Sequence, residues 1–560
     1  MNLPLPAILS EEKCQRHGWW LLLAVTALLY LPGLGILPMM DRDEPRFAHA
    51  TVEMMQRDSW LVPYFNGDYR FDKPPLTYWW MRLHYHLLGV HEFAARLHTV
   101  VSTWLVAVFI LGIGQRLGSA RMGMLAGIAW LLTLQVLVHG RLCVADMPMV
   151  LFVTMALRAV LELLMKPQRR FIRWHWVLFI ALGLGFLAKG PIAWIVPALA
   201  LLLHRFVFWG RHTEWSSFHF GKGMTLALAI VGLWGIPALI QTGGLFWKVG
   251  MGEHVVERGA SALNGRFPVP GYYFVTAILS LFPWIALFPQ IWRRVAQRWT
   301  MTNALLLSWF VAPYVIFTFY ATQLPHYVMP GFPAAMLLLG KGLDLRVKSR
   351  WRWWSWGVVA AMALAPLIAL CAGLHPAMPP ALRPLLLHGA LTLTLIAFVG
   401  WLVVKLSQRG TRTAYGALAV AVICLPLSFA IVMRDIRNIH PAVQLRCVLG
   451  PVAPNTQCLG WQFTEPSLVY HFDHPWRFTS KQETVEKQLR KPGDTILVML
   501  RREWTLSHTL RNDGPAKDFS KEVDQVLAAH PEFHPVEVHG FNAARSSWVE
   551  LMALRAAVSP

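Results

Sequence analysis

The chain has 560 residues, of which 55% are hydrophobic and only 14% are charged, and its formal net charge is +21. Soluble domains contain about 45–50% apolar and about 25% charged residues, so this composition excludes an ordinary soluble enzyme. The positive charge does not indicate nucleic-acid binding, because the Lys and Arg residues are spread through short loops between apolar runs. That distribution is typical of membrane-protein loops that contact anionic lipid headgroups.

The first apolar run, Gly18 to Leu37, follows a polar start that contains Lys13 and Arg16. A cleaved signal peptide has a shorter apolar core and a small-residue cleavage site. This run is about 20 residues long, which is enough to cross the hydrocarbon core of a bilayer. We therefore expect an uncleaved anchor that forms the first membrane span.

Further apolar runs of spanning length follow, which predicts about 13 spans in all. They lie at 96–115, 121–139, 147–165, 174–188, 190–209, 223–241, 271–292, 302–321, 325–343, 354–373, 383–404 and 413–433. The two runs on either side of Lys189-Gly190-Pro191 also fit one broken helix. Alternate loops are rich in Lys and Arg, which predicts a cytoplasmic N-terminus and, for an odd number of spans, an outside C-terminus.

Two long segments lie outside the membrane in this topology, a polar loop at 39–95 and a tail at 434–560. In the tail, the apolar patterns predict two helices and two strands, at 481–489, 520–529, 495–500 and 546–553. The predicted fold is an all-α polytopic membrane domain, residues 1–433, followed by a small extracytoplasmic α/β domain. For Cys447 and Cys458 of the tail, a disulfide and two free thiols remain equally open.

The loop after the first span carries four charges in six residues, at Asp41-Arg42-Asp43-Glu44-Pro45-Arg46. A second polar element, Tyr69-Arg-Phe-Asp-Lys-Pro-Pro75, follows in the same loop. Other outside loops repeat such charges, at Arg141, Asp146, Lys189, Glu253-His254 and Glu257-Arg258. A solvated loop with an amphipathic helix on the bilayer is one interpretation. Because the charges all lie on one side of the membrane, we favour one extracytoplasmic cavity built from dispersed loops.

Acids beside several cations suit a reaction that orients or deprotonates a nucleophile and stabilises a phosphate leaving group. Nucleotide sugars are absent outside the cytoplasm, so a sugar linked to a lipid phosphate is the natural donor for such a cavity. The pattern therefore favours a glycosyl transfer from a lipid carrier.

The order of three short motifs carries a family resemblance: Asp43-Glu44 before Arg46, then Asp72-Lys73-Pro74, then Leu324-Pro325-His326-Tyr327. Over residues 18–345 the chain resembles the polytopic lipid-phosphate-sugar glycosyltransferases of the C-type fold (GT-C), in particular the bacterial lipid A 4-amino-4-deoxy-L-arabinose transferases. It is more distantly similar to the protein O-mannosyltransferases.

This resemblance implies that Asp43 is the catalytic acid, with Glu44 as its neighbour and Asp146 as a second acid. It implies contacts to the donor phosphate from Lys73, Lys189, Arg258, Tyr327 and Arg46. The chain departs from the aminoarabinose enzymes in two places, with Asp72 where they usually carry Glu, and with Tyr320-Ala-Thr-Gln323 where they carry a Lys-rich stretch. Both departures leave the sugar and the acceptor open.

Several of these residues also have ordinary structural interpretations. Lys73 fits a lysine that reaches from the interface, Lys189 fits a loop lysine, and Tyr327 fits an interface aromatic. Asp72 and His254 together could hold a divalent cation, although a His with acids is a non-specific pattern. We expect no other cofactor.

The sequence therefore predicts an inverting glycosyltransferase of the bacterial inner membrane. It would use a polyprenyl-phosphate sugar on the periplasmic face and modify lipid A or another envelope glycolipid. Transfer to Ser or Thr of an exported protein is one alternative. A transporter or flippase of lipid-linked sugars is the other, although no inverted repeat is detectable.

Overall fold

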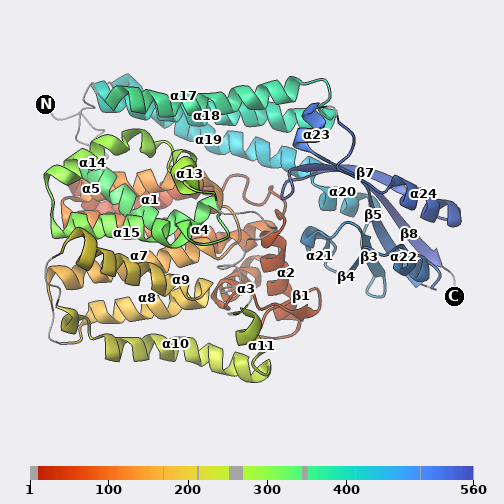
Figure 1. Ribbon diagram of the computed structural model, residues 1–560, viewed down its shortest axis with the longest axis horizontal. Coiled ribbons are helices and arrows are strands. Elements are labelled where there is room, and N and C mark those ends of the chain that lie inside the picture. The colour runs from red at the N-terminus through yellow and green to blue at the C-terminus, as the bar shows by residue number, and fades with distance from the viewer. Residues whose placement is uncertain are drawn as a thin grey trace.

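The computed structural model describes residues 10–167, 170–210, 214–250, 252, 269–342, 351–409, 412–491, 493–511 and 513–558. Two parts are visible in Figure 1, a bundle of helices and a sheet domain at the C-terminal end. The outer loop between α1 and α4 lies where the two parts meet. The predicted site residues His254 and Arg258 lie outside the described residues.

The helices of the bundle are α1 (Glu11–Tyr30), α4 (Glu92–Leu117), α5 (Ala120–Leu131), α6 (Leu134–His139), α7 (Asp146–Met165), α8 (Arg173–Lys189), α9 (Ile192–Leu203), α10 (Phe220–Gln241), α13 (Tyr272–Ser280), α14 (Phe288–Gln297), α15 (Met301–Thr318), α16 (Phe332–Gly342), α17 (Arg352–Leu374), α18 (Arg383–Arg409) and α19 (Arg412–Ile439). The outer loop forms α2 (Asp43–Gln56), a hairpin of β1 (Tyr64–Phe65) and β2 (Asp68–Tyr69), and α3 (Leu76–Leu88). Short helices include α11 (Leu245–Trp247) and the 3₁₀ turn η7 (Pro325–Gly331).

Among the described residues, seven helices are long and apolar enough to cross a membrane. They are Glu92–Leu117, Asp146–Met165, Trp215–Gln241, Met301–Thr318, Arg352–Leu374, Pro380–Ser407 and Ala419–Ile439. A pair bent by 106°, Tyr272–Ser280 with Trp284–Gln297, brings the number to eight if it is one span. The chain is therefore a multi-pass membrane protein, but the count of 13 is not confirmed.

The remaining expected spans do not meet this test, and several of them end early or are divided, although α8 is one unbroken helix of 17 residues. The first helix ends at Tyr30, just before Pro32, and the run to Leu37 continues as turns. The run at 121–139 breaks at Thr133 between α5 and α6. The apolar composition of these runs predicts unbroken spans, but the helices end at positions that the composition does not reveal.

The C-terminal part is a mixed sheet with helices on both faces. Its elements are α20 (Pro441–Leu449), β3 (Gln457–Trp461), α21 (Pro466–Phe472), β4 (Trp476–Thr479), α22 (Gln482–Leu489), β5 (Gly493–Thr505), α23 (Leu506–Arg511), β6 (Lys517–Asp518), α24 (Ser520–Ala529), β7 (Val536–Asn542) and β8 (Ser547–Val558). The strand order is β4-β3-β5-β8-β7, with β6 paired to β5. Strand β3 is parallel to β4 and β5, whereas β8 is antiparallel to β5 and β7. The two helices and two strands predicted for the tail are confirmed.

The middle of β5 explains why its sequence is a continuous apolar run. Ile496 and Val498 pack with α20 and α21 on one face, whereas Leu497 and Met499 pack with α22 and α24 on the other. A strand covered on both faces is apolar at every position. The last bundle helix, α19, continues to Ile439, within the range assigned to the tail. Cys447 and Cys458 are both free thiols.

The sheet domain contacts the outer loop through two polar links. Asp41 accepts hydrogen bonds from the backbone N–H of Ser467 at 2.8 Å and from its hydroxyl at 2.6 Å. The side-chain amide of Asn66 donates to the carbonyl of Trp476 at 2.8 Å, and Trp476 N–H donates back to Asn66 Oδ1 at 2.7 Å. These links hold the loop that carries the candidate site against the C-terminal domain.

Candidate functional site

The first turn of α2 separates two neighbouring acids. Asp43 is exposed, whereas Glu44 is buried at 2% exposure. Both are stabilised at a helix N-terminus, where the helix dipole favours negative charge. Because adjacent side chains of a helix point in different directions, the Asp43 carboxylate faces solvent and the Glu44 carboxylate faces the protein interior.

Glu44 forms a buried bidentate ion pair with Arg96 of α4. Arg96 Nε and Nη2 each lie 2.8 Å from one oxygen of Glu44. The same carboxylate accepts backbone N–H groups from Cys143 at 2.8 Å and from Met40 at 3.0 Å. Arg96 also donates to the carbonyl of Leu37 at 2.6 Å. This geometry fixes the start of α2 to the bundle and leaves both oxygens of the buried Glu44 carboxylate engaged, so Glu44 suits a positioning role.

A second charged group lies in the loop beside α2. Arg70 Nη1 is 2.7 Å from Asp72 Oδ2, and Arg70 Nε donates to the hydroxyl of Tyr78 at 3.1 Å. Burial raises the pKa of Tyr78 to about 12, so the hydroxyl stays protonated. Burial and the neighbouring charge of Arg70 lower the pKa of Arg46, while Asp43 and Asp72 raise it. Arg46, Asp43 and Asp72 are therefore close enough to interact.

Arg70 is a residue that the sequence reasoning missed. It belongs to the Tyr69-Arg-Phe-Asp-Lys element, in which the sequence predicts functional roles only for Asp72 and Lys73. Its burial beside an acid gives it a role in fixing the direction of the Asp72 carboxylate. A signal was present, because a buried Arg in an outer loop requires a partner.

A cavity of about 260 Å³ lies next to this group and contains two cations. Lys73 and Lys189 line one part of it, and Lys73 Nζ also donates to the carbonyl of Asp72 at 3.0 Å. Helix α10 forms an apolar wall, with Val231 and Ile236 among its lining residues. The cavity therefore combines positive charge with a long apolar surface.

Lys189 owes its position to the ends of two helices. It is the last residue of α8, where Gly190 takes a positive φ of 81° that ends the helix. Asp146 is the first residue of α7, and Lys189 Nζ lies 2.5 Å from its Oδ1 atom. A cation at a helix C-terminus and an anion at a helix N-terminus are both favourable.

Two histidines and Tyr327 surround this ion pair. His326 Nε2 is 3.8 Å from Asp146 Oδ1, and the His326 ring lies 4.5 Å from that of His139. Lys189 Nζ lies 5.6 Å from the centre of the Tyr327 ring. The structure thus brings together Asp146, Lys189 and Tyr327 as the sequence predicts, and adds two histidines that the sequence analysis did not select.

The described residues contain no group of three or more His, Cys, Asp and Glu side chains arranged to hold a metal ion. Of the two residues predicted for a cation, Asp72 pairs with Arg70, and His254 lies outside the described residues. The divalent cation stays a prediction.

Comparisons with known proteins agree with this layout. A family model described as dolichyl-phosphate-mannose-protein mannosyltransferase matches residues 72–235. The undecaprenyl phosphate-alpha-4-amino-4-deoxy-L-arabinose arabinosyl transferase 1 of Sodalis glossinidius is 30% identical over 450 residues, 77% of this chain and 79% of that protein. The corresponding transferase of Serratia proteamaculans is 27% identical over 436 residues, 75% of this chain and 77% of that protein.

A solved structure shares the fold. The crystal structure of ArnT from Cupriavidus metallidurans bound to undecaprenyl phosphate has a TM-score of 0.74 and 20% identity, and the likeness covers 96% of this chain and 98% of that one. The fold likeness therefore includes the C-terminal domain as well as the bundle.

Proposed function

We propose that this chain, which belongs to the family of undecaprenyl phosphate-alpha-4-amino-4-deoxy-L-arabinose arabinosyl transferases, moves a sugar from a polyprenyl-phosphate carrier to lipid A or a related envelope glycolipid. Membership of the family makes the chain a glycosyltransferase. The names of the relatives make 4-amino-4-deoxy-L-arabinose on undecaprenyl phosphate the first donor to assay.

The observation that carries the proposal is the composition of the 260 Å³ cavity. A polyprenyl-phosphate donor has a phosphate beside the sugar and a long apolar chain. Lys73 and Lys189 supply the positive charge that a phosphate needs, and the α10 wall supplies an apolar surface for the chain. Arg258 lies outside the described residues, and its contact to the same phosphate stays a prediction.

Among the four acids of the site, Asp43 is the one available to the acceptor. Glu44, Asp72 and Asp146 each hold an Arg or Lys at 2.8 Å or less. Asp43 makes no ion pair or hydrogen bond to a described residue and is exposed. A carboxylate that is held in no ion pair is the better base for an acceptor hydroxyl.

The proposed reaction is a single displacement with inversion. The acceptor oxygen attacks the anomeric carbon of the donor and passes its proton to the Asp43 carboxylate. The bond from that carbon to the phosphate oxygen breaks, and the phosphate keeps the electron pair. Lys73 and Lys189 then neutralise the departing lipid phosphate, which is the usual electrostatic contribution in such a transfer.

We place the reaction at the periplasmic face of the bacterial inner membrane, with a cytoplasmic N-terminus and a periplasmic C-terminal domain. The support is the alternation of Lys- and Arg-rich loops along the sequence. In that orientation the outer loop and the carboxyl end of α8 lie on the periplasmic side of the membrane.

The test is mass spectrometry of lipid A from cells with and without this chain. We expect a mass increment on lipid A that disappears in the deletion strain and identifies the transferred sugar. An unchanged lipid A spectrum, together with donor-derived label in an exported protein, would instead support protein O-glycosylation. That second candidate is favoured by the description of the family model that matches residues 72–235.

A further inference from the structure

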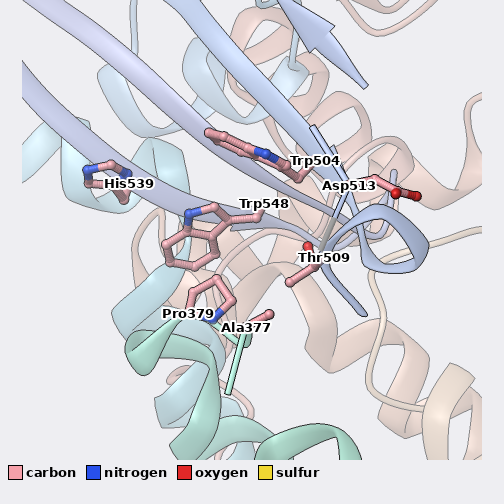
Figure 2. Close-up of a pocket in the computed structure, with 7 residues that line it drawn as sticks. All are labelled: Ala377, Pro379, Trp504, Thr509, Asp513, His539 and Trp548. Atoms are coloured by element: carbon pink, nitrogen blue, oxygen red, sulfur yellow. The ribbon is translucent and has the colours of Figure 1, made fainter. Parts of the chain in front are cut away.

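A second cavity, of about 230 Å³, lies where the C-terminal sheet meets the connection between α17 and α18. Figure 2 shows its two sides. Ala377 and Pro379 belong to the helix connection, whereas Trp504, Trp548 and His539 belong to strands of the sheet. In Figure 1, α23 beside this cavity and α10 beside the donor cavity lie at opposite edges of the molecule, so the two cavities are separate sites.

Strand register builds the aromatic side of this cavity. Trp504 of β5 lies directly opposite Trp548 of β8, so both side chains project from the same face of the sheet. His539 of β7 is paired with Glu550, two positions from Trp548, and therefore shares that face. The rings of His539 and Trp548 are nearly parallel, at 13°, with centroids 6.3 Å apart. The result is an extended aromatic surface that faces the helix connection.

The polar groups of the cavity are few and uncharged, apart from one acid. Thr509 and Asp513 complete its lining, and Asp513 is exposed. Among the described lining residues there is no Lys or Arg. The indole N–H groups of Trp504 and Trp548 have no acceptor in the part of the chain that the structure describes. These features disfavour a phosphate, in contrast to the cavity that contains Lys73 and Lys189.

Apolar ring faces combined with a few hydrogen-bonding groups are the surroundings that a sugar ring requires. The C–H face of a pyranose packs on an aromatic plane, while its hydroxyl groups pair with N–H, hydroxyl and carboxylate groups at the edge. A volume of about 230 Å³ is small enough to suit the single ring of a headgroup rather than an oligosaccharide.

The position of the cavity indicates that its ligand is a lipid. Helices α17 and α18 are candidate membrane spans, and α17 exposes Leu367, Ile368 and Leu374. The cavity lies at the end of this hairpin, beside the carboxyl end of α17. A lipid whose acyl chains lie along α17 would place its headgroup next to Trp548, at the membrane–water boundary.

We propose that this cavity binds the saccharide headgroup of a membrane glycolipid, at a site separate from the donor cavity. The site recruits or orients a sugar-bearing lipid, and its existence does not depend on which acceptor the enzyme modifies.

The test measures lipid retention by the full-length protein in phosphatidylethanolamine nanodiscs with native mass spectrometry. The probe is monoglucosyl diacylglycerol, a neutral one-sugar lipid, and the comparison lipid is phosphatidylglycerol with the same acyl chains. We expect preferential retention of the glucosyl lipid, and an approximately five-fold loss in Trp504→Ala from the lost ring contact. Trp504→Phe keeps an aromatic face and should retain most of the preference.

Asp513→Lys is a second variant at an exposed position, where folding is not at risk. It should weaken the glucosyl-lipid preference and raise retention of phosphatidylglycerol. Free methyl glucoside at high concentration should displace the glucosyl lipid if the headgroup is the feature recognised. Displacement by phosphatidylglycerol alone would instead mean recognition of the acyl chains.

Equal retention of both lipids by the wild-type protein, or equal losses of both in Trp504→Ala, would overturn the proposal, since the tryptophans would then be interface anchors only. Binding of undecaprenyl phosphate checks the fold of each variant. It also separates this site from the proposed donor site, because Lys189→Met should lower undecaprenyl phosphate binding and leave glucosyl-lipid retention unchanged.

Discussion

Lys189 Nζ lies 2.5 Å from Asp146 Oδ1, so the carboxyl end of α8 and the amino end of α7 meet in one ion pair. The pair holds the Lys189 ammonium at the edge of the cavity that we assign to the donor. In the proposed function, Asp146 would therefore position Lys189, and the Lys189 ammonium would face the phosphate of the donor.

Lys189→Met should weaken binding of undecaprenyl phosphate about 10- to 100-fold, the range for losing one charge-assisted hydrogen bond. Lys189→Arg keeps the charge and should lose much less. Binding can be measured by native mass spectrometry of the purified protein. Unchanged binding in Lys189→Met would contradict the assignment of Lys189 to the donor site.

Asp43→Asn should lower kcat by about 10²- to 10⁴-fold, the usual contribution of a general base, while donor binding stays unchanged. A single-turnover assay with purified donor and lipid A measures this loss. Because Asp43 is exposed, the substitution should leave folding intact. Near-normal turnover in the variant would reject Asp43 as the base.

Arg96→Met tests the structural role of the Glu44 ion pair and serves as a control for Asp43→Asn. It removes the partner of Glu44, and Arg96 does not line the donor cavity. Breaking a buried ion pair from one side costs about 3–5 kcal/mol, so we expect a large drop in thermal stability and in folded yield. The activity of the protein that remains folded should fall less than that of Asp43→Asn. Scanning calorimetry in detergent measures the stability, and an unchanged melting temperature would contradict this role of the pair.

Gly235→Leu should block the apolar part of the donor cavity. Gly235 lines that cavity, and a Cβ added there meets no atom within 4 Å, so the new side chain extends into open space. Gly221, on the same helix and also with open space, is not among the lining residues and provides the control. We expect Gly235→Leu, and not Gly221→Leu, to weaken undecaprenyl phosphate binding. Equal effects of the two variants would indicate a general disturbance of α10.

Docking of the C-terminal domain should weaken as the pH rises from about 4 to about 7. Burial raises the pKa of Asp41 to about 7, with Glu465 adding to the rise and the hydrogen bonds from Ser467 opposing it. The docked state therefore holds a proton that the undocked state releases, so docking is favoured below the ordinary carboxyl pKa and loses that contribution as the pH approaches 7. Hydrogen exchange of α21 at fixed pH steps, corrected for intrinsic rates, reports docking.

In Asp41→Asn that pH dependence should disappear, because the amide keeps an acceptor for Ser467 without a titrating proton. If wild-type and variant show the same pH profile, another group controls docking.

The sequence indicates which residues belong to the site better than it indicates which partners they contact. Lys189 and Asp146 are identified from their motifs, since each stands at an end of an apolar run where a charge is conspicuous. The difference between Asp43 and Glu44 could not be predicted, because it depends on Arg96, which lies far along the chain on α4. Neighbours in sequence take different roles when only one of them reaches a distant partner.

The fold shows the same limit. The continuous apolar run at 495–500 predicts β5, because a strand buried on both faces leaves an unmistakable pattern. Membrane spans are less certain, since apolar composition does not reveal breaks such as that at Thr133. The aromatic cavity was also missed, because Trp504 and Trp548 become neighbours only through the pairing of β5 with β8.

The link between Asn66 and Trp476 has a consequence for how this domain can vary. Asn66 uses its side chain, and its positive φ of 58° suits few other residues, whereas Trp476 takes part only through its backbone. Substitution should therefore be restricted at position 66 and far freer at 476, as far as this link is concerned. For this link, a C-terminal domain transplanted from a relative would need no matching residue at the corresponding strand if the recipient loop keeps its asparagine, whereas the link from Asp41 would still require a hydroxyl at position 467.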